Sequence, residues 1–272
     1  MFLCCIWKNL TSPAVFLDKN KYFEGKKPLI IPHRGGRNIV PENTLHALEN
    51  TVRSNFTHFE TDLRMSRDGI VFLHHDPTLD RTTHTKGYVS NIEWDDLKKI
   101  NAGSKFYEKN GLDMKTSFIS LRDALGTFED LFFNLDLKQG GMAEKVYKII
   151  KETKSEERTL VSSFSPLRLD KFYRISKGEI LTSGSFRENI IARFLSVKER
   201  KFKVNALQAP FIWKGIKVHS KKLRDFCNIN NLYLHIWTVN TVSEFESCLN
   251  FGCDGIITDE PIKLRDYLEN LS

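Results

Sequence analysis

The sequence predicts an α/β protein built on a parallel sheet that closes into a (β/α)8, TIM-type barrel. Short apolar runs alternate with helical stretches along the chain, an order typical of parallel strands joined by helices. The length of 272 residues fits one barrel domain, for which about 250 residues is typical. Hydrophobic residues make up 40% of the chain, enough for a closed core, so a second domain is not required.

Nine apolar runs are candidate strands for the eight places of such a barrel. They are residues 29–31, 58–63, 70–73, 131–137, 160–164, 180–183, 206–209, 232–239 and 255–258. Only residues 64–69 separate the second run from the third, whereas a parallel crossover needs about a dozen residues or more. Asp68 and Gly69 form a turn signal. We therefore expect 70–73 to return as the antiparallel arm of a hairpin.

Five charged clusters lie at or beside these runs. They are His33-Arg34, Glu42-Asn43, Glu60-Thr61-Asp62, His75-Asp76 and Asp136-Leu137-Lys138. Side chains alternate across a strand, so Glu60 and Asp62 share one face. With Asp136 they provide three carboxylates at neighbouring strand ends. Oxygen ligands suit hard cations, so we expect these three residues to hold one divalent cation, Mg²⁺ or Ca²⁺.

Two histidines, His33 and His75, supply groups that titrate near neutral pH, at about 6.5 when unperturbed. We expect His33 to act as the base, activating water or a neighbouring hydroxyl of the substrate, and His75 to act as the acid; the reverse order stays open. Arg34 and Lys138 would neutralise a phosphate, because arginine offers a planar fork and lysine a point charge.

These clusters resemble the glycerophosphodiester phosphodiesterase family, in particular through His33-Arg34-Gly35, Pro41-Glu42-Asn43-Thr44, Glu60-Thr61-Asp62 and His75-Asp76. Ser163-Phe164-Ser165, Trp237-Thr238-Val239-Asn240 and the segment 254–261 are also similar to it. The resemblance implies a barrel enzyme that hydrolyses glycerophosphodiesters to glycerol 3-phosphate and an alcohol with a divalent metal and two histidines. It also implies that Trp237 lines the mouth of the site, with Phe164 as a further candidate; otherwise Trp237 is a large core contact.

Asp136 departs from the family pattern, in which a glutamate usually stands here. Aspartate is shorter, which a calcium shell tolerates better than a strict magnesium octahedron. Lysophospholipid-cleaving relatives with the same barrel resemble this chain in using aspartate. Two alternatives therefore stay open. One is a lysophospholipase D whose acyl-chain groove is lined by the insertion and the N-terminus, and the other is a catalytically silent, membrane-associated binding protein.

The outer parts of the chain give weaker predictions. Residues 1–28 are expected to form an N-terminal segment before a barrel domain at 29–272. Residues 77–120 lose the regular alternation and are expected to form a small insertion near the catalytic rim, either a lid or a passive surface loop. Glu42 either acts directly in the site or belongs to a helix start capped by Asn43 or Thr44. Alternation makes His58 and His74 structural residues.

Charge and cysteine content limit which binding partners and which cellular compartment are expected. The net charge of +7 suits a phosphate-bearing small molecule, a glycerophosphodiester or lysophospholipid, or peripheral contact with an anionic membrane. No nucleic-acid partner is expected, because no recognition module is present. Five cysteines without a Cys-x-x-Cys pair favour reduced thiols and the cytoplasm. Membrane association through the apolar residues 1–8, or through acylation of Cys4 or Cys5, stays open, as does the oligomeric state.

Overall fold

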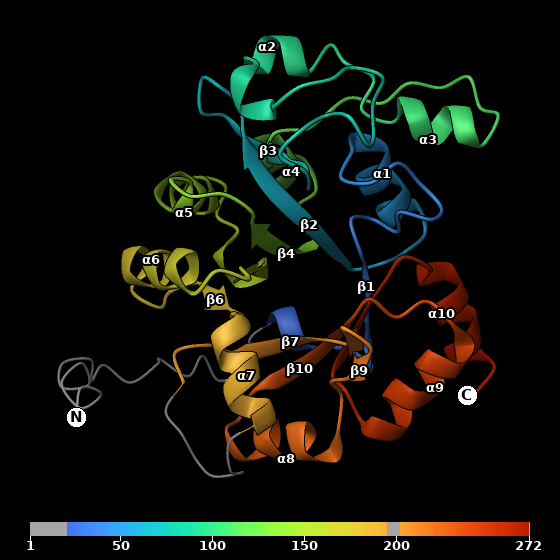
Figure 1. The fold of residues 1–272 in the computed structure, drawn as a ribbon, viewed down its shortest axis with the longest axis vertical. Helices are drawn as coiled ribbons and strands as arrows, with labels where there is room; N and C mark the ends of the chain where they lie inside the picture. The colour runs from blue at the N-terminus through green and yellow to red at the C-terminus, as the bar shows by residue number, and fades with distance from the viewer. Residues whose placement is uncertain (1–20, 195–201, 272) are drawn as a thin grey trace.

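The structure is a computed structural model that describes residues 21–194 and 202–271. Across these ranges, eight parallel strands follow one another around a central barrel (Figure 1). They are β1 (Leu29–Pro32), β2 (His58–Met65), β4 (Phe132–Leu137), β5 (Thr159–Ser162), β6 (Leu181–Thr182), β7 (Ala206–Pro210), β10 (Tyr233–Trp237) and β11 (Gly255–Thr258). Most of them are buried along nearly their whole length, as expected of apolar runs that form parallel strands covered by helices.

The barrel consists of two sheets joined at two seams. One sheet has the order β1-β11-β10-β7, and the other β3-β2-β4-β5-β6. His33 pairs with Glu60 in a parallel bridge that joins β1 to β2, and Ser183 pairs with Ala206 where β6 meets β7. These two bridges close the ring, so the predicted (β/α)8 barrel is confirmed.

A helix follows each barrel strand and covers its outer face. These helices are α1 (Leu45–Arg53), α4 (Leu121–Thr127), α5 (Ala143–Glu152), α6 (Pro166–Ser176), α7 (Phe186–Phe194), α8 (Lys221–Ile229), α9 (Val242–Phe251) and α10 (Pro261–Glu269). Hydroxyl side chains cap several of them; Thr44 accepts a hydrogen bond from the amide of Ala47 at the start of α1. The apolar core beneath the helices forms two large clusters, one around β2, β4 and β5 and one around β7, β10 and β11.

Strand β3 (Val71–Leu73) is the predicted antiparallel arm. It pairs with the end of β2, Leu63 opposite Leu73, which confirms the hairpin and places His75 over the end of β2. The chain then forms η2 (Val89–Asn91), α2 (Trp94–Leu97) and α3 (Ser104–Lys109) before it reaches α4. This part has its own small core, which includes Phe72 and Phe118.

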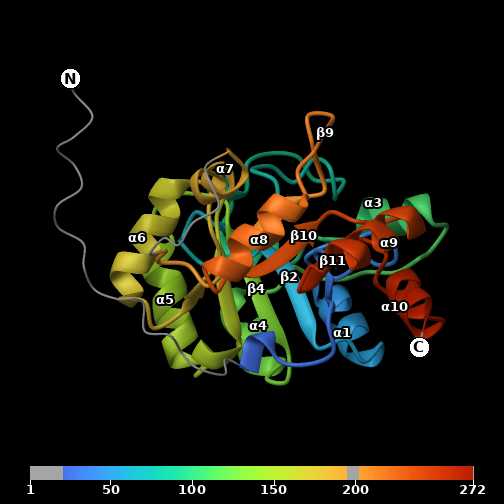
Figure 2. The ribbon, with the colours of Figure 1, turned by 90° about the horizontal axis from the view of Figure 1, so that it is seen from below.

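A second hairpin was not expected from the sequence. Strands β8 (Ile212–Trp213) and β9 (Ile216–Lys217) pair antiparallel after β7. Lys214 and Gly215 between them have φ angles of 48° and 80°, the left-handed conformation that a two-residue hairpin turn requires. Figure 2 shows that this hairpin, α7 and the loops of the predicted insertion extend from the same end of the barrel.

The opposite end of the barrel is closed by η1 (Lys21–Phe23). Tyr22 and Phe23 are buried against Leu160, Leu181 and Ala206, so this part of the predicted N-terminal segment packs on the barrel. Residues 1–8, with Cys4 and Cys5, lie outside the described residues. Within 21–194 and 202–271, no helix has the length and apolar character needed to span a bilayer.

Candidate active site

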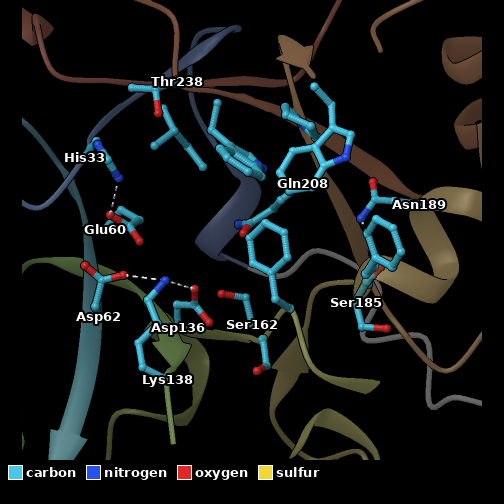
Figure 3. A pocket seen from close by; sticks show the side chains of 18 of the residues that line it. His33, Glu60, Asp62, Asp136, Lys138, Ser162, Ser185, Asn189, Gln208 and Thr238 are labelled. Atoms are coloured by element: carbon cyan, nitrogen blue, oxygen red, sulfur yellow. Dashed lines mark hydrogen bonds and ion pairs between the residues drawn. The ribbon is translucent and has the colours of Figure 1, made fainter. Parts of the chain in front are cut away.

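A cavity of about 730 Å³ opens at the carboxyl ends of the barrel strands. Strand ends at this rim carry the functional groups of barrel enzymes. Nearly all site residues expected from the sequence line this cavity: His33, Arg34, Glu60, Asp62, His75, Asp136, Lys138, Phe164 and Trp237. Figure 3 shows the acidic and basic side chains on one side of the cavity and aromatic rings on the other. Glu42 is not among the lining residues.

The carboxylates meet because of strand register. Asp62 on β2 lies directly beside Asp136 on β4, and both side chains point into the barrel. Lys138 Nζ lies 2.9 Å from Asp62 Oδ1 and 2.6 Å from Asp136 Oδ2. Arg34 Nε lies 3.0 Å from Asp62 Oδ2, and the backbone amide of Arg34 donates to Glu60 Oε2 at 3.0 Å. Two cations therefore face three buried carboxylates.

Burial and mutual repulsion govern the ionisation of these carboxylates. Burial, reinforced by the charge of Asp62, raises the pKa of Glu60 well above its ordinary value. Burial likewise raises the pKa of Asp136. Burial acts in the same direction on Asp62, but Lys138 and Arg34 overcome it and hold the pKa of Asp62 well below its usual range. Three ionised carboxylates would exceed the two positive charges of Lys138 and Arg34, and the raised pKa values of Glu60 and Asp136 reflect this excess.

The carboxylates supply the kind of donor atoms that a hard metal ion prefers. Asp136 Oδ1 is buried without a hydrogen-bond partner in the described part of the chain. Oxygen-only donors and an unpaired carboxylate oxygen fit a hard divalent cation. As arranged here, however, no group of three or more acidic, histidine or cysteine side chains among the described residues surrounds a single metal position, because Lys138 lies between Asp62 and Asp136.

His33 is held by a buried carboxylate that the sequence analysis did not single out. His33 Nδ1 lies 2.6 Å from Asp259 Oδ1, and Asp259 is 1% exposed. Burial lowers the pKa of His33 below its ordinary value, although the hydrogen bond to Asp259 acts in the opposite direction. The imidazole is therefore neutral at pH 7. Because Nδ1–H donates to Asp259, Nε2 is left as the acceptor, 3.9 Å from Glu60 Oε2.

His75 has the same arrangement through its neighbour in sequence. Its Nδ1 lies 2.6 Å from Asp76 Oδ1, and Asp76 Oδ2 accepts from Arg81 Nε at 2.6 Å. Arg81 also donates two hydrogen bonds of 2.7 Å to Glu42. Glu42 in turn accepts from Arg34 at 2.9 Å. A chain of charged groups thus connects His75 with Arg34.

Glu42 lies between the start of α1 and two arginines of the site. Thr44, not Asn43, caps α1, and Glu42 precedes the helix. Burial favours the neutral form of Glu42, but hydrogen bonds from Arg81 and the charge of Arg34 lower its pKa to about 2. Glu42 therefore holds two arginines in place without reaching the cavity. Asn43 has another task, since its Nδ2 donates to Asp62 Oδ2 at 3.0 Å.

The turn after β1 brings Arg34 over the carboxylates. Arg34 has φ 54° and Gly35 has φ 87°, a conformation that glycine adopts without cost. A Cβ on Gly35 would lie 2.6 Å from the Cβ of Ala47 and 2.8 Å from the ring of Phe59. Glycine is therefore required at position 35 both by the backbone conformation and by the space available.

Aromatic side chains form the other wall of the cavity. Trp237 makes an edge-to-face contact with Phe164 at a centroid distance of 5.3 Å, and Phe164 stacks on Trp213 at 6.1 Å. Phe186 and Ile190 of α7 complete this wall. None of the lining residues in the described ranges belongs to 77–120, so the expected apolar lining by the insertion is not found.

The remaining buried histidines lie away from the cavity. His58 Nε2 bonds to the carbonyl oxygen of Tyr22 at 2.8 Å, and His74 Nε2 bonds to that of Thr78 at 3.0 Å. His235 is fully buried, and burial lowers its pKa to about 3. His58 and His74 therefore have the structural roles that alternation predicts.

A barrel with paired histidines, clustered carboxylates and two cations at its catalytic rim defines an enzyme that acts on phosphate esters. The model of the glycerophosphoryl diester phosphodiesterase family matches residues 33–263, and the chain belongs to that family. A glycerophosphodiester phosphodiesterase of Caldanaerobacter subterraneus is 30% identical over 241 residues, covering 86% of this chain and 95% of the relative. The expectation of a glycerophosphodiester phosphodiesterase is thereby confirmed.

Two further similarities come from a curated protein and a solved structure. A lysophospholipase D of Rattus norvegicus is 25% identical, covering 89% of this chain and 86% of the relative. An Oleispira antarctica phosphodiesterase, solved with sn-glycerol-3-phosphate, is 22% identical with a TM-score of 0.72, and the match covers 89% of this chain and 97% of that one. The second similarity supports the barrel fold.

Proposed function

We propose that this chain cleaves glycerophosphodiesters in the rim cavity by acid-base catalysis between His33 and His75. One observation carries the proposal: each histidine has its Nδ1 fixed by a carboxylate at 2.6 Å. The two imidazoles thereby keep their Nε2 atoms for the substrate. The products are glycerol 3-phosphate and an alcohol.

His33 is the proposed base. Its neutral imidazole has a free acceptor at Nε2, and a proton taken there is stabilised by Asp259 through Nδ1. The proton comes from water or from the neighbouring hydroxyl of the glycerol. Attack by that hydroxyl gives a cyclic phosphate, which water then opens. Positioned proton transfer of this kind contributes about 100-fold to 10,000-fold.

His75 is the proposed acid, which donates its proton to the departing alkoxide. Its side chain is 32% exposed, compared with 13% for His33, which suits a group that meets a variable leaving alcohol near the mouth. Arg34 and Lys138 neutralise phosphoryl oxygens, and Trp237 packs beside the glycerol or the leaving group. The aromatic wall with Phe164 excludes water from one side of the phosphate.

Glu60, Asp62 and Asp136 are the proposed ligands of one divalent cation, Mg²⁺ or Ca²⁺. The unpartnered oxygen of Asp136 and the raised pKa values of Glu60 and Asp136 support this assignment. When bound, such a cation supplies neutralising charge to the phosphate. Asp62 keeps its orientation through Asn43, and Lys138 balances the charge that remains.

The decisive experiment measures release of glycerol 3-phosphate from glycerophosphocholine by the full chain, with Mg²⁺, Ca²⁺ or a chelator. His33→Ala and His75→Ala are expected to lose at least about 100-fold in kcat. His84→Ala is the matched control, because His84 is exposed on the insertion and pairs only at the surface with Glu108. Full turnover by either histidine variant contradicts the mechanism, and chelator-insensitive activity contradicts the metal proposal.

A second candidate, lysophospholipase D activity, is favoured by the aromatic wall of Phe164, Phe186 and Trp213. An apolar surface that leads out of the cavity suits an acyl chain on the substrate. Comparing kcat/KM for lysophosphatidylcholine and glycerophosphocholine tests it: preference for the lysolipid supports this candidate, and preference for glycerophosphocholine opposes it. The alternative of a silent binding protein has less support, because both histidines keep their partners.

Location in the cytoplasm remains part of the proposal. Cys227, Cys248 and Cys253 are free and buried, which suits a reducing compartment.

A further inference from the structure

The catalytic rim has a polar half and an apolar half. The charged residues of the site come from β1, β2, β3 and β4, whereas the connections after β5, β6 and β7 present apolar side chains. Since each barrel strand runs towards this rim, the first residues of the helix that follows also lie there. The starts of α6 and α7 and the β8–β9 hairpin are therefore neighbours on one side of the cavity mouth.

These three connections expose large apolar side chains. Leu167 in the first turn of α6 is 81% exposed, and Ile212 in the hairpin is 51% exposed. We define the apolar arc by these two residues and four others that are 39% to 45% exposed: Phe164, Phe186, Ile190 and Trp213. Single exposed apolar residues are ordinary, but a contiguous group marks an interaction site.

Ring contacts join the connections into one surface. Trp213 lies 6.1 Å from the ring of Phe164 and 6.3 Å from that of Phe186. Ile190 follows Phe186 by one helical turn and so lies on the same face of α7. The arc is thus continuous with the apolar wall of the cavity, and part of it faces outward.

Basic side chains accompany the arc. Residues 211–222 contain Lys214, Lys217, Lys221 and Lys222 and no acidic residue; of these, Lys221 pairs with Asp225 one turn further along α8. Lys214 is at the tip of the hairpin, and Lys214 and Lys217 are exposed. The nearby acids of α6 and α7, Asp170 and Glu188, share the charge of Arg187, so one net negative charge remains there against the two exposed lysines of the hairpin. The arc therefore presents a positive border.

We propose that the apolar arc and the hairpin lysines dock on the surface of an anionic phospholipid bilayer, with the cavity mouth turned towards the headgroups. Indole and aliphatic side chains enter the interfacial region. Lysines beside them attract acidic lipids and extend their charge towards the headgroups. The positive border is the feature that favours an anionic bilayer over an apolar protein partner. The proposal does not depend on the catalytic mechanism, because docking is measured without turnover.

The test is co-sedimentation of the full chain with vesicles of phosphatidylcholine containing phosphatidylserine, compared with vesicles of phosphatidylcholine alone. The first variant is Leu167→Ser with Ile212→Ser, and its control is Ile229→Ser at the far end of α8, where Ile229 is 47% exposed. The second is Lys214→Asn with Lys217→Gln. Asparagine tolerates the positive φ of Lys214; Lys177→Asn, at φ 51° at the other end of α6, is the matched control.

The wild type is expected to bind the vesicles that contain phosphatidylserine and to lose binding as salt is added. Each lysine removed weakens binding about fivefold, and the apolar variant weakens it by about tenfold or more. Both controls bind as the wild type does. Turnover of soluble glycerophosphocholine is unchanged in all four proteins, because none of the substituted side chains lines the cavity.

Three results would overturn the proposal. Wild-type protein that stays in the supernatant with acidic vesicles excludes docking. Equal binding to both kinds of vesicle removes the role of charge. Wild-type binding by the variant that lacks Leu167 and Ile212 places the contact elsewhere. A dimer that dissociates in that variant, without vesicle binding by the wild type, would assign the arc to a second copy of the chain.

Discussion

Replacement of Asp259 by asparagine tests the proposed base most directly. Asp259 Oδ1 contacts both His33 Nδ1, at 2.6 Å, and Arg37 Nε, at 3.0 Å. Its Oδ2 accepts from Asn240 Nδ2 at 2.9 Å. A carboxylate accepts at both oxygens, whereas an amide has only one oxygen and donates at its nitrogen.

Neither orientation of an amide at position 259 satisfies these partners. If its oxygen faces His33 and Arg37, its NH₂ group meets the NH₂ group of Asn240. Rotation of Asn240 does not resolve this conflict, because its Oδ1 accepts from the backbone amide of Asp259 and from Thr258. If the amide turns over, its NH₂ group meets His33 Nδ1 and forces the imidazole proton onto Nε2. Nε2 is then unable to accept a proton from the attacking hydroxyl or water.

The magnitude follows from these contacts. A hydrogen bond to a charged group is worth about 1.5–3 kcal/mol and a neutral one about 0.5–1.5 kcal/mol, so the exchange costs about 1–2 kcal/mol even with the correct tautomer. This is about 5-fold to 30-fold in rate. The unfavourable tautomer adds to the loss, and we expect kcat of Asp259→Asn to fall by about 100-fold to 1,000-fold.

The assay is the pH dependence of kcat/KM with glycerophosphocholine. A neutral base loses activity as pH falls through its pKa, which for His33 lies below the ordinary value. Asp259 raises the pKa of His33, so its removal shifts the acidic limb to still lower pH while the plateau falls. Asp254→Asn is the control, because Asp254 pairs with Arg224 at the other end of β11. An unshifted limb with kcat within about threefold of wild type would refute the argument.

Three further predictions concern other parts of the site. Arg81→Gln is expected to lower kcat by about 10-fold to 100-fold, because it releases the carboxylate that orients His75. Steady-state kinetics test this, with Arg67→Gln as the control because Arg67 belongs to an exposed ion pair. Equal kcat values for the two variants contradict the prediction. Gly35→Ala is expected to lower the free energy of unfolding by about 2–4 kcal/mol through overpacking and strain. Gly126→Ala is the control that should not lower it, because a Cβ there meets no atom within 4 Å. Denaturant titration compares the free energies of unfolding of the two variants. Mg²⁺ or Ca²⁺ is expected to raise Tm more at about pH 7 than at about pH 4. Carboxyl groups with raised pKa values destabilise the folded protein when they ionise as pH rises, and a bound cation offsets this loss of stability. Equal shifts at both pH values in thermal melts contradict this.

Local rules predicted much of the site. Alternation along a strand placed Glu60 and Asp62 on one face, and the six residues between the runs 58–63 and 70–73 excluded a parallel crossover. Asp259 was not singled out as the partner of His33, because 226 residues separate them and only closure of the barrel brings them together. Arg81 was missed for a related reason, since its link to Glu42 depends on how the insertion folds back.

The apolar arc was also beyond prediction from the sequence. Each exposed side chain is unremarkable alone, and the strands of the hairpin are two residues long, too short for alternation to show. Ile212 and Trp213 are residue types that are usually buried, so the sequence alone suggests that they belong to the core. Their exposure depends on the left-handed turn at Lys214 and Gly215, which carries the hairpin away from the barrel.

The seam between β1 and β2 has a mechanical consequence for the enzyme. The proposed base belongs to one sheet and the carboxylates to the other. Across this junction they are tied by the backbone bridge of His33 and Glu60 and by the contacts of Arg34 with Glu60 and Asp62. A relative rotation of the two sheets would act on these contacts within the site itself. Such a rotation changes the distance between proton acceptor and phosphorus. Stiffness of this junction, measured by amide exchange on β1 and β2, therefore sets how constant the reactive distance is during turnover.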